Sequence, residues 1–73
     1  MTTDLKIQEQ LKNIAISAAN EVKKTKKSIL LEPMNPFERR IIHLTLKEEM
    51  NIETVSEGDG LIKSVKVLYD ENK

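Results

Sequence analysis

The chain has 73 residues, no cysteine, and 12 basic against 12 acidic side chains. This length suits one small domain, and the lack of cysteine excludes disulfides and thiolate metal sites. Because the net charge is zero, only a local cluster of cations could account for nucleic-acid binding, and a single Tyr and a single Phe are too few for extended base stacking. No apolar run approaches the ~20 residues of a membrane span and no apolar signal segment opens the chain, so we expect a cytoplasmic protein without a membrane span.

The first two expected elements are a helix over 4–26 and a short strand over 28–31. Apolar residues recur at spacings of three and four in the first segment, which is the repeat of an amphipathic helix. Ile16 lies off this stripe and is expected to be exposed. The strand is a short apolar run that should stop at Pro33. The residues of the helical stripe are Ile7, Leu11, Ile14, Ala15, Ala18 and Val22.

A second helix should begin at Asn35, where the signals for a helix start are strong. Asn35 suits the N-cap, Pro36 suits the first helical position, and Glu38 stands at N3, where it completes a capping box. We expect this helix to end near residues 50–51.

Two further strands are expected, over 52–56 and 62–69, because apolar and polar residues alternate in both segments. The Glu-Gly-Asp-Gly of residues 57–60 predicts a hairpin loop between them. The element order is therefore α-β-α-β-β in a single α+β domain. The domain covers 1–73, with an ordered core of about 4–69 and frayed ends at 1–2 and 71–73.

The second expected helix has an apolar face and, on the opposite side, a basic face. Neither of its arginines has an acidic residue three or four positions away, so no intrahelical ion pair neutralises the basic face. A basic helix face is often simply solvated. The pattern alone therefore does not decide whether this face binds a ligand or only contacts water. The face expected to pack on the sheet holds Ile41, Ile42 and Thr45, flanked by Phe37, Leu44 and Leu46. The basic face holds Arg39, Arg40, His43 and Lys47.

Arg39 and His43 stand four positions apart and could hold one ligand group together. The guanidinium fork suits a phosphate, and the imidazole can stack on a base or donate a hydrogen bond. With cations around it, His43 is expected to resist protonation and to act as a neutral ring.

Two segments resemble the R-3-H domain, named for an Arg and a His separated by three residues, in the version found in bacterial SpoIIIJ-associated (Jag) proteins. They are Leu31-Glu-Pro-Met-Asn-Pro-Phe-Glu-Arg-Arg-Ile-Ile-His43 and Thr54-Val-Ser-Glu-Gly58. The likeness covers residues 5–69. It implies a three-stranded antiparallel sheet with two helices on one face. It also implies a domain that binds single-stranded RNA or DNA, RNA being the expected ligand, with little sequence specificity.

The resemblance also implies the binding residues. Arg39 and His43 would be the signature contacts, with Arg40 and Lys47 beside them and the loop 56–60 close by. Lys63-Ser64 stands where such proteins usually have two arginines, so one charge is kept and one is lost. Lys63 and Lys66 complete the expected nucleic-acid-binding set. Because these proteins normally carry a KH domain just before this one, the chain is either an excised domain or a short stand-alone relative.

Enzymatic activity is not expected. One histidine, no cysteine and no nucleophile–base pair leave no catalytic residues, and no ligand spacing indicates a metal or another cofactor. The alternative to nucleic-acid binding is a protein-interaction module. In that case the Arg39/His43 face, or the lysine-rich end of the first helix, would dock an acidic partner.

Overall fold

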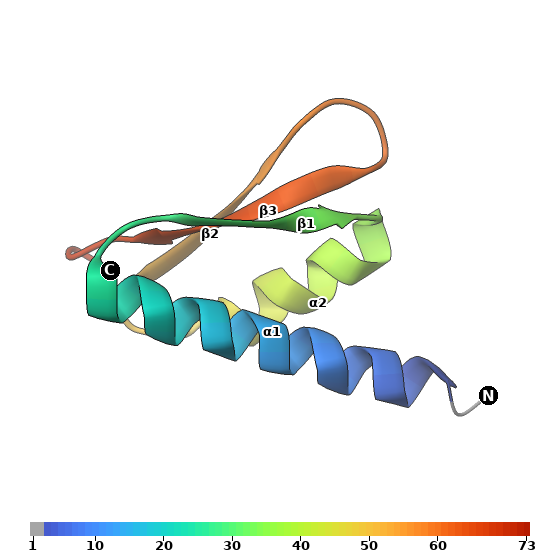
Figure 1. Ribbon diagram of the computed structural model, residues 1–73, viewed down its shortest axis with the longest axis horizontal. Coiled ribbons are helices and arrows are strands. Elements are labelled where there is room, and N and C mark those ends of the chain that lie inside the picture. The colour runs from blue at the N-terminus through green and yellow to red at the C-terminus, as the bar shows by residue number, and fades with distance from the viewer. Residues whose placement is uncertain (1–2) are drawn as a thin grey trace.

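The computed structural model describes residues 3–73, with side chains from residue 7 onward, and has five elements. They are α1 (Thr3–Thr25), β1 (Ile29–Met34), α2 (Pro36–Leu46), β2 (Ile52–Glu57) and β3 (Lys63–Tyr69). The strands form one antiparallel sheet of order β1-β3-β2, and both helices lie on the same face of it (Figure 1). The expected α+β class and the order α-β-α-β-β are confirmed. The predicted fraying at residues 1–2 lies outside the described residues.

The core fills the space between the two helices and the sheet. On α1 the residues at the contact are mostly alanines, whose small side chains allow a close approach of the helices. No polar side chain of residues 7–73 is fully buried. Buried hydrophobic side chains are Leu11, Ala15, Ala18, Ala19, Val22, Met34, Ile42, Leu46, Ile52, Val65 and Val67.

The buried stripe of α1 differs from the expected one at its edges. Ile7 and Ile14 are 41% and 44% exposed, whereas Ala19, outside the expected stripe, is buried. At about 100° per residue, Ile7 and Ile14 lie on one flank of the buried stripe and Ala19 lies on the other. The packed face is therefore rotated toward Ala19. Ile16 is exposed, as expected.

The expected end of the first strand at Pro33 is wrong, because β1 continues through Pro33 to Met34. β1 is an edge strand that pairs only with β3, and an edge strand tolerates a residue without an N–H donor. The pairing register shifts between Leu30 and Pro33. As a result Met34 reaches the core, and its carbonyl lies at the start of α2.

The start of α2 is confirmed in detail. The Asn35 side chain accepts a hydrogen bond from the backbone N–H of Glu38 at 2.8 Å. The Glu38 carboxylate accepts one from the backbone N–H of Asn35 at 3.0 Å, which closes the capping box. Because the box sets the direction in which the chain enters the helix, it also sets which α2 residues face the sheet.

The expected end of α2 near residues 50–51 is wrong, because the helix ends at Leu46. The chain then makes a tighter turn, in which the N–H of Glu49 donates to the carbonyl of Leu46 at 3.1 Å. Asn51 takes a left-handed conformation, with φ of 66°, and its carbonyl accepts from the N–H of Asp70 at 2.8 Å. The pairing of Ile52 with Tyr69 requires this reversal, so the sheet ends the helix.

Two apolar residues of α2 were wrongly expected to pack on the sheet. Phe37 is 54% exposed and Leu44 is 57% exposed. They line an open groove of about 420 Å³ between α1 and α2, together with Gln8 and Lys12. α2 packs against both the sheet and α1, and of its side chains only those of Ile42 and Leu46 are fully buried.

Candidate nucleic-acid interface

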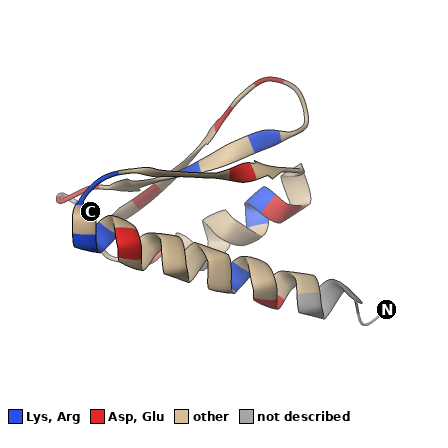
Figure 2. Cartoon of the chain, viewed as in Figure 1, with Lys and Arg blue, Asp and Glu red and all other residues tan. Residues whose placement is uncertain are grey.

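In the part of the chain that Figure 2 colours, lysine and arginine residues are spread over both helices and the sheet rather than gathered on one element. A candidate interface must therefore be a small group of side chains held in a defined geometry. α2, β2 and the hairpin loop 58–62 provide such a group.

Arg39 lies in the first half of α2 and is half-buried. Its Nε donates to the carbonyl of Met34 at 3.2 Å, and its Nη2 donates to the carbonyl of Leu61 at 2.8 Å. One side chain thus connects the end of β1, the start of α2 and the hairpin loop. A guanidinium has five N–H donors, so these two bonds leave others for a ligand.

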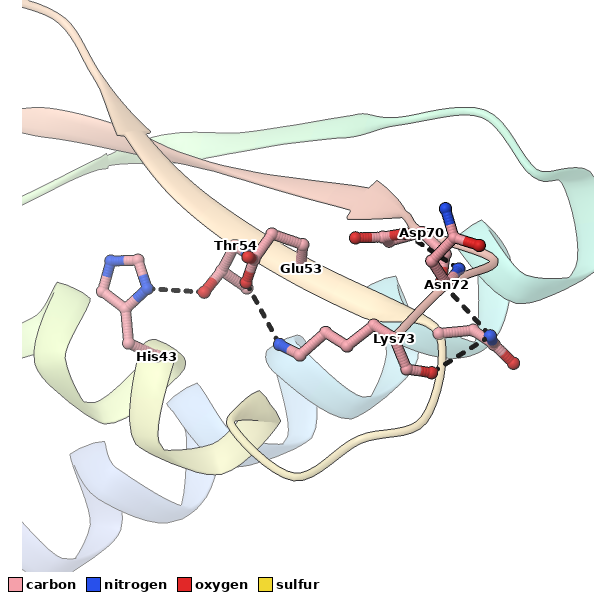
Figure 3. A network of polar contacts seen from close by, with 7 residues as sticks. His43, Glu53, Thr54, Asp70, Asn72 and Lys73 are labelled. Atoms are coloured by element: carbon pink, nitrogen blue, oxygen red, sulfur yellow. Dashed lines mark hydrogen bonds and ion pairs between the residues drawn. The ribbon is translucent and has the colours of Figure 1, made fainter.

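His43 lies one helical turn after Arg39 on the same side of α2. Its Nδ1 lies 2.6 Å from Oγ1 of Thr54, and its Nε2 lies 3.2 Å from Oγ of Ser56. Figure 3 shows the imidazole reaching from α2 to Thr54 on β2. We call the group Arg39, His43, Thr54 and Ser56 the Arg–His site.

The strand β2 places both hydroxyls under the helix because side chains alternate between the two faces of a strand. Thr54 and Ser56 pair in register with the buried residues Val67 and Val65. They therefore occupy the face that Ile52 uses for the core. Near the edge of the sheet, where His43 of α2 lies over β2, their hydroxyls make this face polar instead of apolar.

The pKa of His43 is lowered from its ordinary value, first by burial of the ring and second by the charge of Arg39. Glu53 acts in the opposite direction. The expectation that His43 resists protonation is confirmed, but burial has a larger effect on it than the neighbouring cation does. The ring is therefore a neutral hydrogen-bonding group near pH 7.

Beyond His43, the polar contacts continue to the end of the chain (Figure 3). Glu53 accepts from Nζ of Lys73 and from the N–H of Thr54, each at 3.1 Å. These two hydrogen bonds lower the pKa of the Glu53 carboxyl, and the bond from Lys73 has the largest effect. The carbonyl of Lys73 accepts from the N–H of Asn51 at 3.3 Å, so the end expected to fray folds back on β2.

The other expected binding residues lie at different distances from the Arg–His site. Lys63 begins β3 opposite Met34, on the helix side of the sheet, and lies against Gly58 in the hairpin loop. It is therefore a neighbour of Arg39. Lys47 is exposed at the C-cap of α2, which is about 12 Å along the helix axis from Arg39.

Two expected residues are not brought to the site. Arg40 is exposed and lines the groove between α1 and α2, next to Phe37. Lys66 alternates with the buried Val65 and Val67, so it points to the sheet face without helices. There it pairs with the Glu57 carboxylate at 3.3 Å.

The hydroxyls of Thr54 and Ser56 had not been expected as partners of His43, although the loop that begins at Ser56 was expected close by. The strand alternation contained a signal for them: Ile52, Thr54 and Ser56 share one face, and two of the three are polar. Polar groups in a core-facing register require hydrogen-bond partners. The carbonyls that hold Arg39 leave no such signal, because any residue type provides one.

Two other kinds of site find no support in the described part of the chain. Within residues 3–73 no helix is long and apolar enough to cross a membrane. Among the side chains described, no three His, Cys, Asp or Glu residues gather where they could hold a metal ion.

The lowered pKa of His43 predicts a pH-dependent stability. Between pH 7 and 5.5 the unfolded chain, with a histidine pKa of about 6.5, binds a proton more readily than the folded domain does. The free energy of unfolding should therefore fall as the pH drops below about 6.5. Urea unfolding at pH 7.0 and 5.5 measures this. In His43→Gln the fall should be smaller, since the chain has no other histidine; an equal fall in both proteins would contradict the prediction.

Comparisons with known proteins identify the relatives of this chain. The family model of the R-3-H domain matches residues 9–69. "RNA-binding protein KhpB" of Clostridium symbiosum is 44% identical over 66 residues, which cover 89% of this chain and 30% of that protein. The protein of the same name from Bacillus subtilis (strain 168) is 53% identical over 58 residues, 77% of this chain and 28% of that protein. The chain thus spans less than a third of the length of these relatives. It belongs to the R-3-H domain family.

Proposed function

We propose that this domain binds single-stranded nucleic acid, RNA above all, with little sequence specificity, through the Arg–His site. The observation that carries the proposal is the convergence of Arg39 and His43 beside the hairpin loop, where Arg39 keeps N–H donors for a ligand and Nε2 of His43 faces a solvent-exposed hydroxyl. The names of the relatives, which describe RNA-binding proteins, support RNA as the ligand.

The proposed contacts are mainly to the sugar-phosphate backbone. Arg39 presents its remaining N–H donors to a phosphate, and a guanidinium matches the geometry of phosphate oxygens. Lys63 and Lys47 extend the positive charge on either side of the site, whereas Arg40 lines the groove between α1 and α2. Because phosphates carry no sequence information, a site of this kind binds many sequences alike.

The isolated domain should bind weakly. Few cations surround the site, the net charge is zero, and a single Tyr and Phe offer little stacking. We propose that the domain is one module of a larger RNA-binding protein, with a KH domain before it. Linkage to a second binding module raises the effective concentration at this site without any new contact.

A fluorescence anisotropy titration with short single-stranded RNA and DNA oligonucleotides at two salt concentrations tests the proposal. Affinity should fall steeply with salt for every sequence. Lys47→Ala should weaken binding and lower the salt slope by roughly 0.7, the value for one phosphate contact on a single strand.

Lys24→Ala is the charge-matched control, since Lys24 is an exposed lysine in the last turn of α1. It should leave both the affinity and the slope unchanged. If no oligonucleotide binds at low salt, nucleic-acid binding by the isolated domain is refuted and an acidic protein partner becomes the better explanation of the basic residues.

A further inference from the structure

Both ring nitrogens of His43 face a hydroxyl of β2, Nδ1 that of Thr54 and Nε2 that of Ser56. A neutral imidazole has one N–H and one lone pair, so one hydroxyl must donate to the ring and the other must accept from it. A hydroxyl can do either. The geometry of the two contacts therefore decides which nitrogen carries the hydrogen.

The distances separate the two cases. Hydrogen bonds donated by a hydroxyl are on average shorter than those donated by an N–H, with most common lengths to oxygen of about 2.7–2.8 Å and 2.9–3.0 Å, so the Nδ1–Thr54 separation of 2.6 Å suits a hydroxyl donor better. The Nε2–Ser56 separation of 3.2 Å lies at the long end of the N–H···O range. The two distances therefore favour Thr54 as the donor to the Nδ1 lone pair, with the hydrogen of the ring on Nε2.

Exposure separates the two contacts as well. The bond to Thr54 is half-buried, whereas the bond to Ser56 is exposed to solvent. The inner bond is short and protected from water, and the outer bond is long and open to a ligand. A ligand can therefore displace the outer partner while the inner one keeps the ring in place.

We propose that Thr54 is a positioning residue that selects the Nε2–H tautomer of His43, and that Ser56 is a further binding residue. In the free domain the hydroxyl oxygen of Ser56 accepts the hydrogen bond from Nε2. When nucleic acid binds, a phosphate oxygen takes its place as the acceptor. Its own hydroxyl then donates to the same phosphate. This inference rests on the proposed function and adds to it the atoms that meet the ligand.

The opposite tautomer would not serve this purpose. With the hydrogen on Nδ1, the Nε2 lone pair would point outward and repel a phosphate oxygen. A neutral histidine can assist phosphate binding only if its exposed nitrogen is the donor. The choice of tautomer by Thr54 is thus what makes the uncharged ring useful beside Arg39.

Long-range ¹H–¹⁵N NMR of the imidazole distinguishes the tautomers directly in the free chain at pH 7.5. The expected spectrum has a protonated Nε2 and an unprotonated Nδ1. A protonated Nδ1 would overturn the inference, whatever the domain binds. This experiment needs no variant, so it does not depend on whether a variant folds.

Thr54→Val has nearly the same shape but cannot donate, so it should show a mixture of tautomers and bind short single-stranded RNA several-fold more weakly. Thr54→Ser restores the hydroxyl and should restore both the tautomer and the affinity. An Nε2–H population unchanged in Thr54→Val would refute the role of Thr54. Circular dichroism and thermal unfolding establish that each variant is folded.

Ser56→Ala separates the two residues. It should keep the Nε2–H tautomer, because Thr54 still donates to Nδ1, yet bind RNA a few-fold more weakly because one donor is lost. Affinity equal to that of the unaltered chain would refute the role of Ser56. Failure of the unaltered chain to bind any oligonucleotide at low salt would refute the proposed function, while the tautomer spectrum would still decide the role of Thr54.

Discussion

Arg39→Ala is expected to lower the affinity for a short single-stranded RNA by roughly tenfold to a hundredfold. The estimate follows from losing a charged hydrogen-bonding group worth about 1.5–3 kcal/mol, with 1.4 kcal/mol for each factor of ten. The substitution also removes the bond from Nη2 to the carbonyl of Leu61. The hairpin loop 58–62 then loses its connection to α2, so the ligand meets a less ordered site.

Arg39→Lys distinguishes the effect of the positive charge from that of the hydrogen bonds to the carbonyls of Met34 and Leu61. An ammonium keeps the positive charge but lacks the planar fork that reaches Met34 and Leu61 together. Its salt slope should be close to that of the unaltered domain, while its affinity should remain several-fold weaker. Amide hydrogen exchange in residues 58–62 should be faster in both variants than in the unaltered domain.

Lys24→Ala again provides the control for loss of one charge, and it should change neither affinity nor exchange. If Arg39→Lys binds as tightly as the unaltered domain, the connection to the loop is irrelevant to binding. If Arg39→Ala binds as tightly, Arg39 is not part of the interface.

The largest effect on stability is expected at Ile42. Its side chain is 0% exposed and lies at the centre of the contact between α2 and the sheet. Ile42→Ala should lower the free energy of unfolding by about 2–5 kcal/mol, from lost burial and the cavity left behind. A domain of 73 residues has a total of roughly 4–11 kcal/mol, so this is a large share of its stability. Urea or thermal unfolding measures the change.

Leu44→Ala is the matched control because it removes an aliphatic side chain of equal size from the same helix. Leu44 is 57% exposed, so the change should stay within about 0.5 kcal/mol. The two substitutions also test the exposed position of Leu44 in the structure against the sequence periodicity, which alone placed Leu44 beside the sheet. A loss at Leu44 comparable to that at Ile42 would contradict the structure.

The features that sequence determined were those controlled by neighbours along the chain. The capping box at Asn35 and Glu38 needs only residues three positions apart, and it formed as expected. Arg39 and His43 share a side of α2 because of the helical repeat alone. Strand alternation likewise placed β2 and β3 correctly within one or two residues. The fold class and the core of the site follow from such local rules.

The tertiary structure decided the features that depend on what packs against each element. Periodicity alone could not distinguish the buried Ile42 from the exposed Leu44, because α1 covers only part of α2. The sheet ended α2 early by drawing Ile52 into pairing, and the edge position of β1 admitted Pro33.

The Arg–His site depends both on local sequence and on tertiary packing. Its two signature residues are local in sequence, but the groups that orient them are distant: Leu61 for Arg39, and Thr54 and Ser56 for His43. Those groups meet only when the hairpin of β2 and β3 packs beneath α2. The sequence by itself therefore determined which side chains would form the site. Only the packing of helix on sheet decided their burial, their hydrogen bonds and hence which of their atoms remain for a ligand.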